Sequence, residues 1–214
     1  MSDSSATATP APTAPHDDPV LFRLPTELLL DVLSQLSYEE LHQVERVCKK
    51  MQALVKDKHL DSLLFRQKPM RKLKKGEKVV LHPLMDLVNI VYTCSKDAPI
   101  RFYEDGVKDL NAFDYEACDE FVTQPACTLL YIDLRVGDLA VENSAGLTVR
   151  EVLKSIGTFW GQKPDDTPYW MSDEEARHWT YSSTLGDRNG WSGWYRTSVT
   201  YDGAVSIAAD GYDL

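Results

Sequence analysis

A stretch near the start of the chain, residues 21–65, constrains the fold more than any other. Apolar residues recur in it at steps of three and four, the spacing of one face of an α-helix. Pro25 suits the first turn of a helix, and Ser37 followed by Glu40 has the capping-box pattern that starts a second helix. Helices this short are unstable alone, and the stretch holds more large apolar side chains than one small core needs. We therefore predict a helical module with apolar surface left for a partner.

The order of apolar residues in this stretch resembles an F-box, beginning with the Leu24-Pro25 pair. Met51 and Asp61 depart from the family pattern, because many F-boxes carry Trp at these places. The resemblance implies docking onto the Skp adaptor of a Skp–cullin–F-box ubiquitin ligase, and through the adaptor onto a cullin. The implied adaptor-binding residues are Leu24, Pro25, Leu28, Leu29, Val32, Leu33, Leu36, Leu41, Val44, Val47 and Cys48. The sequence does not divide them between the module's own core and the adaptor.

The segments on either side of this module, assigned to residues 20–65, are polar. Residues 1–19 are rich in Ser, Thr, Ala and Pro, which predicts a disordered tail without the features of a secretory signal. Residues 66–78 are strongly basic and are interpreted as a solvated linker, with a nuclear-localisation or anion-binding patch as the alternative. The chain as a whole has a formal net charge of -10, which argues against nucleic acid as the main partner.

Residues 79–214 are predicted to form an α+β domain of antiparallel strands and two helices. Thr148 with Glu151 and Ser172 with Glu175 repeat the capping-box pattern and predict where the helices begin. We expect these helices to end at Gly161 and near Tyr181. The first of them should bury one apolar face, made of Val149, Val152, Leu153, Ile156, Phe159 and Trp160. Strand patterns cover Val79–Leu81, Leu87–Tyr92, Cys127–Arg135 and Val136–Glu142, and a hairpin is expected over Val199–Ile207 with its turn at Asp202-Gly203. Residues 82–89 could instead begin as a helical turn.

The same region resembles a domain of unknown function that follows F-boxes in many fungal proteins. The resembling pieces are Leu81–Leu84, Leu129–Leu134 and Gly146–Leu153. This second resemblance suggests a fungal protein and implies no activity.

The sequence contains no motif of a known catalytic mechanism, such as a P-loop, G-x-S-x-G or H-E-x-x-H. His82 precedes Pro83 and is expected to cap or pack locally, and His178 is expected to pack or lie on the surface of a helix. The four cysteines lack the spacing of a zinc site and indicate free thiols in a reducing compartment. We therefore predict no catalytic residue, cofactor or metal, and a cytoplasmic or nuclear protein.

Aromatic residues crowd the end of the chain, where all five tryptophans lie between residues 160 and 194. Trp, Tyr and Arg dominate binding hot spots, although the same residues could simply build the core of the domain. The candidate target-binding residues are Arg188, Trp191, Trp194 and Arg196. The leading hypothesis is a non-catalytic substrate receptor of a cullin ligase. The alternatives are a scaffold that binds the adaptor without a ligase role, and a domain that binds a small ligand or has enzymatic activity.

Overall fold

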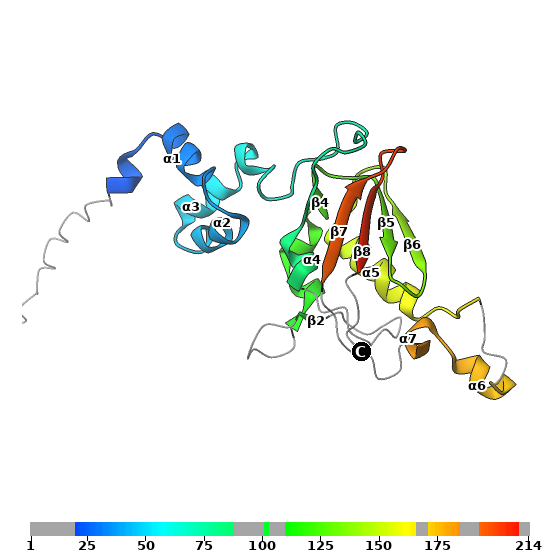
Figure 1. The fold of residues 1–214 in the computed structure, drawn as a ribbon. Helices are drawn as coiled ribbons and strands as arrows, with labels where there is room; N and C mark the ends of the chain where they lie inside the picture. Colours follow the sequence, from blue (N-terminus) through cyan, green and yellow to red (C-terminus); the bar gives the residue numbers. More distant parts are fainter. Residues whose placement is uncertain (1–19, 88–100, 103–109, 166–170, 185–192, 210–214) are drawn as a thin grey trace, which may run out of the picture.

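The structure is a computed structural model that describes residues 20–87, 101–102, 110–165, 171–184 and 193–209. Figure 1 shows a group of short helices beside a larger α+β part. The predicted tail, the candidates Arg188 and Trp191, and most of the expected strand Leu87–Tyr92 lie outside the described residues. Within them, no helix is long and apolar enough to cross a membrane.

The helical module is built from three short α-helices and two 3₁₀ turns. The elements are η1 (Val20–Arg23), α1 (Thr26–Leu33), α2 (Tyr38–Glu45), α3 (Lys49–Val55) and η2 (Lys58–Leu60). The predicted capping box starts α2: the Ser37 hydroxyl accepts from the Glu40 N–H, and the Glu40 carboxylate accepts from the Ser37 N–H. Both α1 and α2 pack against α3, and together they bury a small core of their own.

The α+β part is organised around a four-stranded sheet in the order β6-β5-β8-β7. These strands are β5 (Leu129–Asp133), β6 (Asp138–Glu142), β7 (Trp194–Val199) and β8 (Val205–Ala209). The hairpin at the end of the chain is confirmed, with its turn at residues 200–203. The α+β class is also confirmed, but β5 and β8 run parallel, so the sheet is mixed. The prediction of antiparallel strands is wrong for this pair. No tight turn connects β5 to β8, so their relative direction is not set by a local hairpin.

One long helix, α5 (Val149–Trp160), supplies most of the helical side of the larger core (Figure 1). Its predicted capping box at Thr148 and Glu151 is present, and every side chain of its predicted apolar face is buried. The capping box at Ser172 likewise starts α6 (Asp173–His178). That helix ends before Trp179, and a separate short helix, α7 (Tyr181–Thr184), follows.

The remaining elements are short. They are β1 (Val80–Leu81), α4 (Pro83–Leu87), β2 (Arg101–Phe102), β3 (Leu110–Asn111), η3 (Ala112–Asp114), η4 (Glu116–Asp119) and β4 (Thr123–Gln124). The helical alternative is therefore confirmed for the described part of residues 82–89. β1 pairs antiparallel with β4, and β2 pairs antiparallel with β3.

Candidate functional site

The helix α1 carries two adjacent stripes of apolar side chains that meet different surroundings. Leu29 and Leu33 are buried in the core of the module. Leu28 and Val32, each one position earlier, are 49% and 51% exposed. Because i and i+4 positions share one face of a helix, the second pair forms a continuous apolar stripe on the surface. Leu24 precedes the helix by two residues and is also exposed.

The structure thus divides the residues that the sequence left undivided. The fully buried group is Leu29, Leu33 and Leu41, and the partly buried group packed against the same core is Leu36, Val44 and Cys48. The exposed group is Leu24, Pro25, Leu28, Val32 and Val47. The exposed group presents the most side-chain surface to a partner of the folded module. We call Leu24, Leu28, Val32 and Val47 the exposed apolar set.

The two positions that depart from the F-box pattern are accommodated in the fold. Met51 is buried in α3 and belongs to the core of the module. The Asp61 carbonyl oxygen accepts from the backbone N–H groups of Arg66 and Gln67, which closes the chain reversal after η2. The third helix therefore packs without Trp at either position, since the flexible methionine side chain adapts to irregular space.

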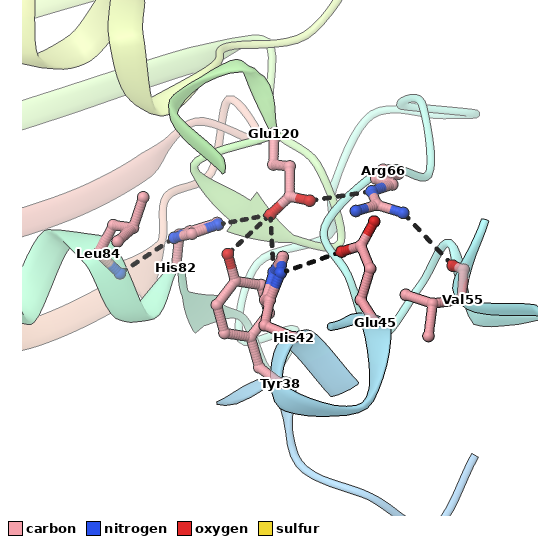
Figure 2. A network of polar contacts seen from close by, with 8 residues as sticks. All are labelled: Tyr38, His42, Glu45, Val55, Arg66, His82, Leu84 and Glu120. Atoms are coloured by element: carbon pink, nitrogen blue, oxygen red, sulfur yellow. Dashed lines mark hydrogen bonds and ion pairs between the residues drawn. The ribbon is translucent and has the colours of Figure 1, made fainter. Parts of the chain in front are cut away.

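A buried carboxylate, Glu120, joins the module to the α+β part (Figure 2). Its oxygens accept from the Tyr38 hydroxyl at 2.8 Å and from Arg66 Nε at 2.9 Å. His82 Nδ1 accepts from the Leu84 N–H at 3.0 Å, so the ring proton is on Nε2, which lies 3.2 Å from Glu120. The prediction that His82 caps locally is confirmed at Leu84.

The charge of Glu120 is compensated within this network. Burial raises the pKa of its carboxyl, but the hydrogen bonds from His82 and Tyr38 and the charge of Arg66 outweigh burial, so the pKa lies below its usual range. Burial, followed by the charge of Glu120, raises the pKa of Tyr38. Tyr38 is therefore held as a neutral donor facing an anion. Through Tyr38, the network holds α2 against the α+β part. Leu28 and Val32 of α1 stay exposed.

The sequence did not indicate this network. Tyr38 and Glu120 are separated by 82 positions, and neither belongs to a motif. A glutamate flanked by Asp119 and Phe121 in an acidic chain has no sequence feature that distinguishes it from a solvated residue. Its burial could be found only from the tertiary arrangement.

The described target-binding candidates have different environments. Trp194 in β7 is partly buried, packs on the larger core and donates its indole N–H to the Met85 carbonyl at 3.0 Å. Arg196 in the same strand is exposed. Trp160 is fully buried in α5, as expected if the aromatics build the core. These positions do not assemble into a binding site within the described residues.

Two observations bear on catalysis and metal binding: the charges around a hollow, and the grouping of His, Cys, Asp and Glu side chains. A hollow of about 480 Å³ beside the network mixes basic residues, among them Lys56 and Arg66, with acidic ones such as Glu45 and Glu116. No group of three or more His, Cys, Asp or Glu side chains in the described part of the chain could hold a metal ion. Among the described residues, Cys48, Cys118 and Cys127 form no disulfide.

Comparison with known proteins identifies the helical module. The family model described as F-box-like matches residues 21–67. We call residues 21–67, which are similar to this family, the F-box-like domain. No curated protein and no solved structure matches the chain. The resemblance of residues 79–214 to a fungal domain of unknown function stays a prediction. The F-box-like domain is an adaptor-type module, and its match ends within the basic segment 66–78.

Proposed function

We propose that this protein is a substrate receptor of a Skp–cullin–F-box ubiquitin ligase, acting in the cytoplasm or the nucleus. The F-box-like domain docks on a Skp-type adaptor and through it on a cullin, while the α+β part holds the target. The observation that carries the proposal is the exposed apolar set: Leu24, Leu28, Val32 and Val47 remain on the surface although the module has its own core. Partly solvated leucines and valines gathered on one small module are typical of a protein interface.

The contribution to chemistry is proximity. A receptor that holds its target beside a charged ubiquitin carrier raises the effective concentration of the target's lysines, and it needs no catalytic group of its own. The Glu120 network supports this role, because it ties the adaptor-docking module to the target-holding part through buried, charge-assisted hydrogen bonds. A fixed orientation between the two parts restricts where a bound target is presented.

The decisive test compares two valines with almost equal exposure. Val32 in α1 is 51% exposed and Val80 in β1 is 50% exposed. Each is replaced by Ala in the full chain, and the affinity for a purified Skp-type adaptor is measured by calorimetry. Val32→Ala removes two methyl groups from the proposed interface and should weaken binding roughly ten-fold. Val80→Ala should leave it unchanged.

Two results would count against the proposal. If Val32→Ala and Val80→Ala bind the adaptor as well as the unmodified chain does, the exposed stripe of α1 is not the docking surface. If the chain binds the adaptor but no cullin co-purifies with the complex, the ligase role is wrong and the protein acts as a scaffold.

A further inference from the structure

Most side chains of the basic segment 66–78 are exposed, as expected of a linker, but Leu73 within it is not. Leu73 is buried in the larger core, together with residues of the sheet and of α5. Gly203, at φ +77 in the β7–β8 turn, lies so close that an added Cβ would be 2.7 Å from the Leu73 carbonyl oxygen. The segment is therefore packed against the α+β part.

A local turn stabilises the same segment. Arg71 makes two hydrogen bonds to the Glu77 carboxylate, at 2.6 and 2.9 Å, and the Lys74 N–H donates to Glu77 as well. Between them, Gly76 has φ +74, a conformation in the left-handed region. These hydrogen bonds hold the backbone of residues 71–77 in a turn.

This packing leaves an apolar and basic hollow on the surface. A groove of about 120 Å³ lies between residues 67–73 and residues 124–126. Its lining has no acidic residue and consists of Gln67, Lys68, Pro69, Met70, Arg71, Leu73, Gln124, Pro125 and Ala126. Met70 projects from it with 82% of its surface exposed. A second hollow, which shares Met70 with the first, adds Lys72. We call Lys68, Met70, Arg71 and Lys72 the 68–72 surface.

The groove has polar groups on its wall and basic side chains beside it. Gln124 Nε2 donates to Gln67 Oε1, while Gln124 Oε1 is buried without a hydrogen-bond partner among the described residues. Lys68 and Lys72 are exposed, with no ion pair between described residues.

We propose that the 68–72 surface binds a short acidic segment of a partner protein, with an apolar side chain of that segment against Met70 and Pro125. Residues 56–78 carry nine basic and three acidic residues, within a chain whose formal net charge is -10. A short acidic peptide contacts only the basic surface, whereas a long polyanion or an anionic membrane would also meet the acidic remainder. Glu142 and Asp202 beside Lys72 limit the basic surface to a few residues.

This inference depends on the proposed function only in that the acidic partner would be a target of the ligase. Binding itself needs no adaptor. The 68–72 surface follows the F-box-like domain directly in the chain and borders the four-stranded sheet at Leu129 and Glu142. It also places recognition outside the tryptophan-rich end that the sequence suggested.

The test uses the full chain and a fluorescent peptide of alternating glutamate and leucine, with binding followed by anisotropy. The unmodified protein should bind this peptide, more weakly as salt is raised. Lys68→Glu combined with Lys72→Glu should weaken binding about ten-fold or more, because like charges then face each other. Met70→Ala should weaken it about ten-fold without changing the net charge.

The matched control reverses two exposed lysines that do not line the groove, Lys58→Glu with Lys163→Glu. This control carries the same net charge and should bind like the unmodified protein. The proposal is overturned if both double variants lose binding equally, if the unmodified chain does not bind the peptide, or if single-stranded nucleic acid or anionic vesicles bind more tightly. Adaptor affinity of the Lys68→Glu, Lys72→Glu protein should be unchanged, so failure of the peptide test leaves adaptor docking intact.

Discussion

The F-box-like domain and the α+β part use their apolar residues differently. Every exposed leucine among the described residues, namely Leu21, Leu24 and Leu28, lies in the helical region, where Val32 and Val47 are also exposed. The large exposed residues of the α+β part are instead three tyrosines, Met70 and Val80. Both parts bury a core of their own, but the helical part also leaves aliphatic surface for a second protein. The difference separates residues that maintain the fold from residues available for binding.

The largest expected loss of stability comes from a substitution in the core of the α+β part. Leu153 in α5 is fully buried, so Leu153→Ala should lower the free energy of unfolding by about 2–5 kcal/mol through lost burial and a residual cavity. Urea denaturation followed by circular dichroism measures this loss. A loss below about 1 kcal/mol would show that the core relaxes around α5.

Removal of the Glu120 carboxylate, which lies between the two parts, should cause the next largest loss of stability. Glu120→Ala leaves Arg66 and the fully buried His82 without their shared partner, which should cost about 3 kcal/mol of unfolding free energy. Limited proteolysis should then cut more readily between the two parts. If unfolding and proteolysis are both unchanged, the two parts are not held together by this network.

The same residue gives a pH dependence with a defined sign. The folded pKa of Glu120 lies below its usual range, so its contribution to stability is present at neutral pH and is lost as pH falls through the folded pKa. Unfolding free energies of the unmodified chain and of Glu120→Gln, measured from neutral to acidic pH, should converge at low pH. Curves that stay parallel over this range would contradict the assignment.

Loss of a helix cap should have a smaller effect. Ser37→Ala removes the hydroxyl that accepts from the Glu40 N–H at the start of α2, which should cost about 1 kcal/mol. Thr148→Ala at the start of α5 provides the same change in the other part. Thermal unfolding of both variants should show similar losses, because capping is local and does not depend on the surrounding core.

The smallest effect on stability should come from the exposed apolar set. Leu28→Ala is the same substitution as Leu153→Ala, but at a side chain that is 49% exposed, and should change the unfolding free energy by less than about 0.5 kcal/mol. Its effect should appear in adaptor affinity instead. A large loss of stability in Leu28→Ala would show that Leu28 maintains the fold and is not simply available for binding.

Local chemistry accounts for what the sequence predicted. Ser37, Thr148 and Ser172 each begin a helix with the expected capping box, because the donor and the acceptors lie within three residues of one another. The buried face of α5 followed from its apolar spacing alone. The order of Leu and Val residues in the first helices was sufficient to indicate the F-box-like domain that the family model matches.

Tertiary structure decided the features that depend on distant residues. Leu28 and Leu29 are the same amino acid at neighbouring positions, yet only contact with α3 and η2 determines that Leu29 is buried. The parallel pairing of β5 with β8 and the burial of Glu120 also join segments far apart in the chain. Sequence spacing fixes which side chains share a face, whereas the surface that each face meets is set by the folding of the whole chain.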